Sequence, residues 1–373
     1  MQRDVRLDIV RGWLQLTIFA SHVSGSWIGR WLIHGAWGLS DSSEQFVFLS
    51  GLTLGSVFDY KLTRYGWRVA TRDMLIRTAR LYRTHLLVLI GFTALMMALR
   101  LSSTLSDEIA MLHWTYWFEH PIEASIGAIV LLYQPAFMDI LPIFILCMMV
   151  LPGFGWLLTR VGGWALLPPI WVYTAVELFG LRLPYLGNSS VGFNVLAWQI
   201  LFVLGAWIGW KTRHGEWQIR HQGFFVGFAL LVVVGALAIR LAQHGLLPWH
   251  LPMQFDAWFD KRNLTPLRVI HALSVAFLVA FIIPRKAKWM RLRIFVALTF
   301  IGKNSLRIFC LGLFLSLACS LVLRVQPYST WLDFLLISSG VGLLAAYATL
   351  IDWQSRSVIA PMRSMEPQSP ANT

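Results

Sequence analysis

An arginine and a histidine lie inside the first hydrophobic segment, and this feature constrains the fold more than any other. Arg11 and His22 belong to residues 8–26, a run that is otherwise apolar enough for a transmembrane helix. At about 100° per residue, the step of eleven residues leaves the two side chains only about 20° apart around the axis. They would stand roughly 16 Å apart along it, about half of a hydrocarbon core of about 30 Å. Ionisable side chains at such depth are costly, so this polar face indicates a functional site.

The same face carries further polar residues. Asp8, Gln15 and Ser26 fall within about 40° of His22, whereas the other faces of the segment are mostly apolar. One polar stripe is therefore predicted to connect one membrane surface with the middle or far half of the bilayer.

The composition indicates an integral membrane protein. Of the 373 residues, 57% are hydrophobic and only 13% are charged, which excludes an ordinary soluble domain. The three cysteines, Cys147, Cys310 and Cys319, lie in apolar segments, so neither a disulfide framework nor a zinc site is expected, and no metal is predicted. The N-terminus is basic and then apolar like a signal peptide, but we interpret it as an uncleaved first span.

The hydrophobic runs predict an all-α membrane bundle with about ten transmembrane helices. Most of the 31 lysines and arginines lie in the loops on the side of the two termini, which places both termini in the cytoplasm. The net charge of +13 is thus a topology signal, and nucleic-acid binding is not expected. Residues 1–353 are predicted to form the membrane domain and residues 354–373 a short cytoplasmic tail without fixed structure. The expected spans are 8–26, 43–60, 84–100, 136–153, 163–180, 195–211, 222–240, 266–284, 303–323 and 331–352.

The first span supplies two candidate site residues. The imidazole of His22 can take a proton from a hydroxyl or carry an acyl group itself, and its alternative role is helix packing. Arg11 can clamp a phosphate or a carboxylate, or it can extend toward the cytoplasmic surface as a snorkelling side chain.

Three further candidates lie in other segments. Arg77 and Arg80 are one turn apart in the basic amphipathic stretch before the third span. They can bind the phosphates of a cytoplasmic nucleotide-type donor or simply anchor the helix at the membrane surface. Asp139 stands at the outer part of the fourth span, where it can orient an imidazole, cap a helix or lie at the interface.

The second span has small residues at helical spacing and acids at its outer end. Gly51 and Gly55 allow a close approach of another helix. Asp41 and Glu44 are expected to be solvated. In the long outer segment, the aromatic residues can stack on sugar rings or belong to an interfacial belt; they are Trp114, Tyr116 and Trp117.

Several motifs together resemble a known family. Arg11 and His22, then FLSG and IRTARLY, are similar to the acyltransferase-3 superfamily of integral membrane proteins. The order of five motifs over about residues 3–353 resembles the OpgC family more narrowly. These are RDVRLDIVRG, FVFLSG, YQPAFMDILPIF, FNVLAWQILFVLGA and GKNSLRIF. Leu311 and Gly312 stand where many members of the superfamily have a histidine, so no second catalytic histidine is expected there.

The resemblance implies an O-acyltransferase of the bacterial inner membrane. Its co-substrate would be acyl-CoA, with succinyl-CoA implied by the OpgC family, and no bound cofactor is expected. The acceptor would be an osmoregulated periplasmic glucan. By the same resemblance His22 would be catalytic, with Arg11, Arg77 and Arg80 on the donor side, while the role of Asp139 stays open. The alternatives are a polytopic transporter or flippase, and an acyltransferase for another cell-envelope polysaccharide.

Overall fold

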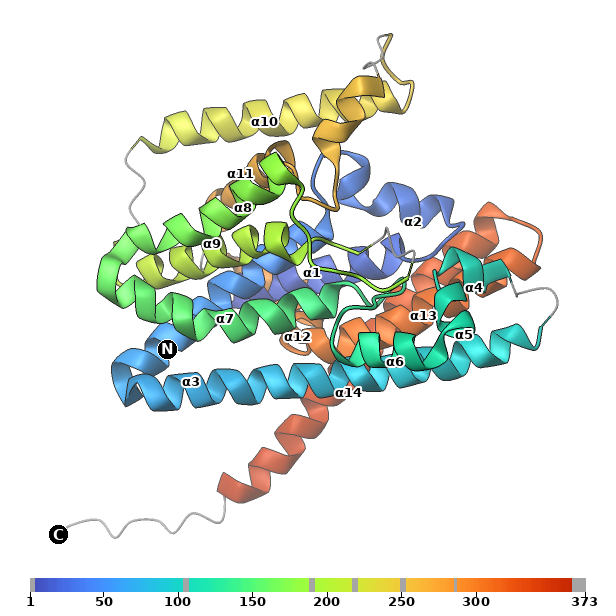
Figure 1. Ribbon diagram of the computed structural model, residues 1–373, viewed down its shortest axis with the longest axis horizontal. Helices are drawn as coiled ribbons and strands as arrows, with labels where there is room; N and C mark the ends of the chain where they lie inside the picture. The colour runs from blue at the N-terminus through green and yellow to red at the C-terminus, as the bar shows by residue number, and fades with distance from the viewer. Residues whose placement is uncertain are drawn as a thin grey trace. The chain divides into compact units, whose positions relative to one another are not determined.

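The computed structural model describes residues 4–102, 107–187, 192–216, 221–248, 253–284 and 287–363. Within these residues all regular elements are α-helices or short 3-10 helices, as the sequence predicts (Figure 1). The chain forms two compact units. Unit 1 consists of residues 1–32 and 283–373, and unit 2 consists of residues 33–282.

Unit 1 is built around the N-terminal helix. Its core packs Phe19 and Ile9 of that helix against Ile301, Leu344 and other buried apolar residues of the C-terminal helices. Its elements are α1 (Val5–Ser21), α2 (Trp27–Leu32), η4 (Lys288–Arg291), α12 (Arg293–Lys303), α13 (Ser305–Val325) and α14 (Thr330–Arg363).

Two glycines bring α1 and α12 into backbone contact. A Cβ added at Gly12 would overlap the carbonyl oxygen of Leu298, and one at Gly302 would overlap that of Asp8. Only glycine permits helices to approach this closely, so the pair fixes α12 against the helix that carries Arg11 and His22. The sequence had not predicted α12, whose residues fall between two expected spans.

Unit 2 contains the remaining helices. A close contact of its two central helices, α3 and α9, follows from Gly51 and Gly55, whose added Cβ atoms would overlap the backbone of Phe202 and Ala206. The elements are η1 (His34–Ala36), α3 (Ser42–Arg100), α4 (Asp107–Met111), α5 (Thr115–Glu119), α6 (Pro121–Ile129), α7 (Ile140–Val161), η2 (Gly162–Leu166), α8 (Leu167–Phe179), α9 (Val195–Arg213), α10 (Gln222–Gln243), η3 (Met253–Phe259) and α11 (Pro266–Ile282).

Helix α3 is 59 residues long and reverses its direction at Gly66 (Figure 1). Gly66 has φ 79° and ψ 173°, a conformation that is essentially restricted to glycine. In a straight helix Lys61 and Asp73 would be about 18 Å apart, yet Lys61 Nζ lies 2.5 Å from Asp73 Oδ1. This ion pair closes the turn, so α3 contains both the second and the third expected spans.

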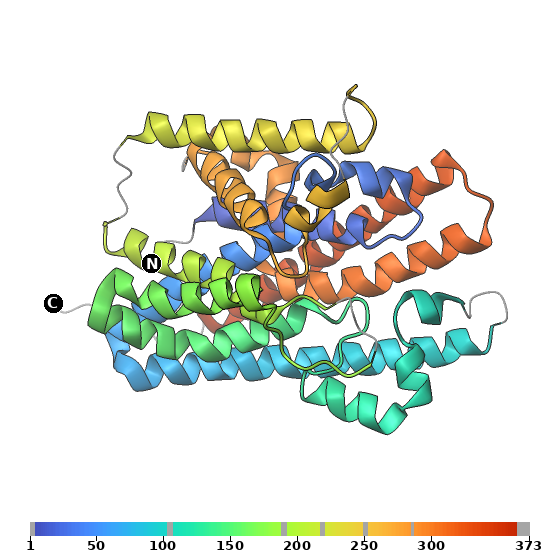
Figure 2. The ribbon, with the colours of Figure 1, turned by 45° about the horizontal axis from the view of Figure 1, so that its top comes forward.

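Within the described residues, six helices are long and apolar enough to cross a membrane. They are 42–100, 140–179, 195–213, 222–243, 305–325 and 330–355. Helices α1 and α11 have 17 residues each and fall just below that length. Helix α10 lies at the outside of unit 2 beside α11, with only 11% of its most apolar stretch buried (Figure 2).

The structure corrects the end of the first expected span. Helix α1 ends at Ser21, and His22 occupies its C-cap position rather than its interior. Gly25 follows with φ 85°, which turns the chain away from the helix axis. Ser26 therefore does not lie on the stripe of His22. At the other end of the chain α14 extends to Arg363, so residues 354–363 of the predicted tail 354–373 are helical, and residues 364–373 lie outside the described residues.

Candidate functional site

The hydrogen bonds of His22 define the orientation of its ring. Nδ1 lies 2.7 Å from the carbonyl oxygen of Ile18, one turn back in α1, and 3.3 Å from Ser21 Oγ. Because a carbonyl oxygen only accepts, Nδ1 is the donor of that bond. In the neutral ring the lone pair is then on Nε2, which is the arrangement that a general base requires. The side chain is half-buried at the end of the helix.

The segment that follows His22 is held by the C-terminal helices of unit 1. Ser24 N donates to Ser320 Oγ at 2.8 Å. Ser26 Oγ donates to Asp333 Oδ1 at 2.5 Å, and Ile28 N donates to Asp333 Oδ2 at 2.9 Å. Asp333 is fully buried in the first turn of α14. These bonds fix the chain immediately beyond the catalytic candidate.

The other polar residues on the stripe of α1 differ in their exposure to solvent. Arg11 is half-buried, whereas Asp8 and Gln15 are buried. Within the described part of the chain, Gln15 Nε2 has no hydrogen-bond partner. The stripe is thus a polar face inside unit 1, as the helical spacing predicts.

Arg77 and Arg80 lie on α3 in unit 2, after the reversal at Gly66. Arg77 Nε donates to Asp73 Oδ2 at 2.8 Å, and the same carboxylate binds Lys61. Arg80 is exposed. The charge of Arg77 is therefore partly balanced within the fold, and Arg80 is the more available of the two for an anion.

Asp139 precedes α7 and occupies its N-cap position without a side-chain cap hydrogen bond. Its carboxyl group is subject to the charges of Lys261 and Asp41. Asp139 thus belongs to unit 2, together with Arg77 and Arg80, whereas His22 and Arg11 belong to unit 1. That Asp139 orients His22 stays a prediction.

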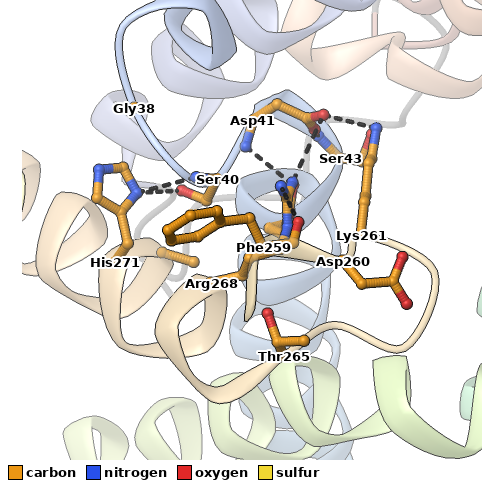
Figure 3. Close-up of polar contacts among 12 residues, drawn as sticks. Gly38, Ser40, Asp41, Ser43, Phe259, Asp260, Lys261, Thr265, Arg268 and His271 are labelled. Atoms are coloured by element: carbon orange, nitrogen blue, oxygen red, sulfur yellow. Dashed lines mark hydrogen bonds and ion pairs between the residues drawn. The ribbon is translucent and has the colours of Figure 1, made fainter. Parts of the chain in front are cut away.

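A cluster of four charged residues in unit 2 was not predicted as a site. We call Asp41, Glu44, Lys261 and Arg268 the outer charge cluster, and Figure 3 labels Asp41, Lys261 and Arg268. Arg268 forms an ion pair with Glu44, to which its Nε also donates at 2.8 Å. Lys261 Nζ lies 2.5 Å from Asp41 Oδ2, and Arg268 lies 3.9 Å from the same oxygen. The cluster joins the start of α3 to α11 and the loop before it.

Burial and the neighbouring charges shift the pKa values of Asp41 and Lys261 in opposite directions. Burial would raise the pKa of Asp41, but the charges of Lys261 and Arg268 and a hydrogen bond with Glu44 hold it well below its usual range. Burial would lower the pKa of Lys261, but the charges of Asp41 and Glu44 raise it. Glu44 is fully buried. The expectation that Glu44 is solvated is therefore wrong, whereas Asp41 is half-buried. Each of the two acids has a basic partner from a distant part of the sequence.

Two histidines lie beside the outer charge cluster. His271 Nδ1 accepts a hydrogen bond from Ser40 N at 3.1 Å and lies 2.7 Å from Ser40 Oγ. His34 interacts with Asp41, and burial lowers its pKa. Nothing in the sequence indicated this grouping, since its two segments, residues 34–44 and residues 261–271, are far apart in the chain.

A family comparison covers nearly the whole chain. The model described as OpgC protein matches residues 3–356. The chain belongs to the OpgC family. No curated protein and no solved structure matched it. Family membership and the apolar helices together make the chain a membrane acyltransferase-like protein.

The aromatic residues of this OpgC-family chain differ in their availability for a sugar. Trp114 is fully buried, so it is part of the packed interior. Tyr116 OH donates to Glu123 Oε2 at 3.1 Å, and Trp117 Nε1 donates to Ser125 Oγ at 3.1 Å. Among the residues that the structure describes, no three His, Cys, Asp or Glu side chains group as metal ligands would.

Proposed function

We propose that this OpgC-family chain is an O-acyltransferase of the bacterial inner membrane. It transfers an acyl group, succinyl by family resemblance, from cytoplasmic acyl-CoA to a hydroxyl of a periplasmic glucan. One observation carries the catalytic role of His22: its Nδ1 donates to the carbonyl oxygen of Ile18, which leaves the lone pair of the neutral ring on Nε2.

In the proposed reaction, Nε2 takes the proton of a glucan hydroxyl while the hydroxyl oxygen attacks the thioester carbonyl. The C–O ester bond forms, the C–S bond breaks, and the CoA thiolate takes the proton from the imidazolium. The bond from Nδ1 to the Ile18 carbonyl holds the ring in one orientation throughout and favours the imidazolium. In a second version of the mechanism Nε2 attacks the thioester and carries the acyl group before the sugar accepts it.

The contacts of unit 2 support the proposed topology. Segments that the charge distribution assigns to the periplasm contact one another: Asp41 binds Lys261, Asn194 N donates to the Arg262 carbonyl, and Leu186 N donates to the Leu132 carbonyl. Segments assigned to the cytoplasm do the same, since Arg213 Nε donates to Asp59 Oδ2 at 2.5 Å.

The described helices can supply ten crossings. Helix α3 would cross twice because it reverses at Gly66, and residues 140–179 would cross twice through α7 and α8. Helices α1, α9, α10, α11, α13 and α14 would cross once each. Both termini then lie in the cytoplasm.

The donor would bind on the cytoplasmic side. Its phosphates suit Arg80, which is exposed, and Arg77, which retains hydrogen-bond donors beyond its bond with Asp73. Arg11 would contribute from α1. Acyl-CoA is consumed as a co-substrate, and the mechanism uses no bound cofactor.

Mass spectrometry of periplasmic glucans tests the proposal. Glucans from a strain with the gene should carry an added mass per modified sugar that identifies the acyl group, and glucans from the deletion strain should lack it. His22→Ala should reduce acylation by about 10²–10⁴-fold, the usual contribution of a general acid–base. The protein should remain folded in membranes, and the neighbouring Ser21→Ala should acylate normally. Unchanged acylation by His22→Ala in a strain without a paralogue would contradict the proposal.

A further inference from the structure

A cavity of about 520 Å³ opens in unit 2 between the end of α8 and the loop that precedes α11. Its volume is within the range of about 300–1,000 Å³ that small-molecule sites occupy. Helix α8 contributes Val176 and Glu177, with Gly180 after its end. Helix η3 contributes Ala257, and the loop after it contributes Asp260, Asn263 and Thr265. By the proposed topology this cavity faces the periplasm.

The loop side of the cavity is rigid. Asp260 accepts hydrogen bonds from Arg262 N at 3.0 Å and from Asn263 Nδ2 at 3.1 Å. Thr265 Oγ1 donates to the carbonyl oxygen of Trp258 at 2.7 Å. The next residue along the loop, Lys261, is fixed to Asp41 in the outer charge cluster (Figure 3). The polar groups are thus preorganised on a scaffold that is already anchored to α3.

Glu177 is the one acid of the cavity that this scaffold does not use. It is exposed, and within the described residues it has no hydrogen bond or ion pair, although the charge of Asp260 acts on it. A carboxylate accepts several hydrogen bonds and donates none, which suits the hydroxyl groups of a sugar. Glu177 is therefore free to accept from a ligand.

The charge of the cavity selects the class of ligand. Two carboxylates, Glu177 and Asp260, repel an anion. A metal ion is disfavoured because no group of three His, Cys, Asp or Glu side chains exists in the described part of the chain. Lys261 and Arg262 follow Asp260 directly on the same loop, although neither lines the cavity. Trp258 precedes the loop and is 57% exposed; it does not line the cavity itself, but its carbonyl oxygen accepts from Thr265, which does. A sugar chain that extends beyond the cavity could stack on its ring.

We propose that this cavity binds a neutral oligosaccharide and is the acceptor subsite. The inference rests on the proposed function and deepens it by naming residues for the acceptor. Hydroxyls of unmodified glucose units donate to Glu177 and Asp260. A glucan that already carries succinyl half-esters is anionic, and the two carboxylates repel it, so the site favours unmodified acceptor and releases product.

Binding to the purified full-length chain in detergent tests the site without any acylation step. The probes are maltohexaose, a β-linked glucose hexasaccharide, and the same two hexasaccharides carrying succinyl half-esters. Wild type should bind at least one neutral probe, and should bind its succinylated form several-fold more weakly. Glu177→Ala should weaken neutral binding about tenfold, the order expected for losing a hydrogen bond to a charged acceptor.

Two further variants separate stacking from charge. Trp258→Ala should also weaken binding of the neutral probe. Glu177→Gln should retain most of that binding but show a reduced preference for the neutral over the succinylated probe, because it keeps a hydrogen-bond acceptor and removes one of the two negative charges. Glu119→Ala, an exposed acid on α5, is the matched control and should bind like wild type.

The results distinguish this site from the proposed function. The subsite is overturned if wild type binds neither neutral probe at millimolar concentration, or if Glu177→Ala and Trp258→Ala bind like wild type. Glucan acylation in cells can persist in either case. Conversely, intact probe binding together with glucans that carry no acyl group would leave the subsite standing and overturn the acyl transfer.

Discussion

The polar groups around His22 and those of the outer charge cluster differ in what they bind. The bonds of the His22 ring go to a backbone carbonyl and a hydroxyl, and the ring is half-buried. The buried carboxylate of Glu44 instead faces the guanidinium of Arg268, which is 4% exposed. The bond to the Ile18 carbonyl orients the His22 ring and leaves Nε2 of the neutral ring as an acceptor. Each of the two opposite charges, on Glu44 and Arg268, is removed from water and depends on the other for compensation.

This difference predicts that the two regions fail in different ways. A substitution at His22 should remove chemistry and leave the fold intact. A substitution in the outer charge cluster should lower the stability of unit 2 first and activity only as a consequence.

Glu44→Ala should produce the largest loss of stability. It leaves Arg268 buried without its main carboxylate partner, which typically costs about 3–5 kcal/mol. The melting temperature of the purified protein in detergent should fall markedly, whereas that of His22→Ala should match wild type. The double variant Glu44→Leu/Arg268→Met should recover much of the loss, because it removes both charges. A Glu44→Ala protein that melts like wild type would show that the cluster is not stabilised by this pair.

The close helix contacts of the two units provide the next comparison. An added Cβ at Gly302 would overlap the backbone of Asp8 in unit 1, and one at Gly51 would overlap the backbone of Phe202 in unit 2. Each change to alanine should cost about 1–3 kcal/mol as the helices separate. Gly302→Ala should also reduce acylation, since it displaces the helix that carries His22.

A third glycine is the control for these two variants. Gly227 of α10 has nothing within 4 Å of an added Cβ. Gly227→Ala should leave stability unchanged or raise it by up to about 1 kcal/mol, because alanine favours the helix. If all three variants melt alike, the close contacts do not limit stability.

The local pattern of the sequence was sufficient to predict the polar face of α1 and the all-helical fold. The spacing of Arg11, Gln15 and His22 follows from helix geometry alone, and hydrophobic runs identify apolar helices. The end of α1 was misplaced by several residues, since a run of apolar and small residues continues past Ser21. Gly25 is the signal that the chain leaves the helix there.

The outer charge cluster could not be predicted because its partners are distant in the chain. Glu44 and Arg268 are separated by 224 residues, and each looks like an ordinary interfacial charge in its own segment. The cavity beside α8 could not be predicted for the same reason, since its residues Glu177 and Asp260 come together only in the folded unit. Helix α12 was missed because its apolar run is short, and its position depends on the glycine contact with α1.

Lys261→Met should have the smallest effect on stability. The pH dependence of that effect distinguishes the half-buried pair of Lys261 and Asp41 from the buried pair of Glu44 and Arg268. The Lys261 side chain is 36% exposed, so its pair with Asp41 should contribute only about 1 kcal/mol or less. Because folding depresses the pKa of Asp41, that carboxylate contributes fully above its unfolded pKa of about 4 and loses its contribution as the pH falls through the folded value. Because folding raises the pKa of Lys261, the amine contributes fully below about pH 10 and loses its contribution at still higher pH. The difference in melting temperature between wild type and Lys261→Met should therefore narrow below about pH 4. A difference that did not narrow below about pH 4 would show that the charge of Asp41 does not contribute to the pair.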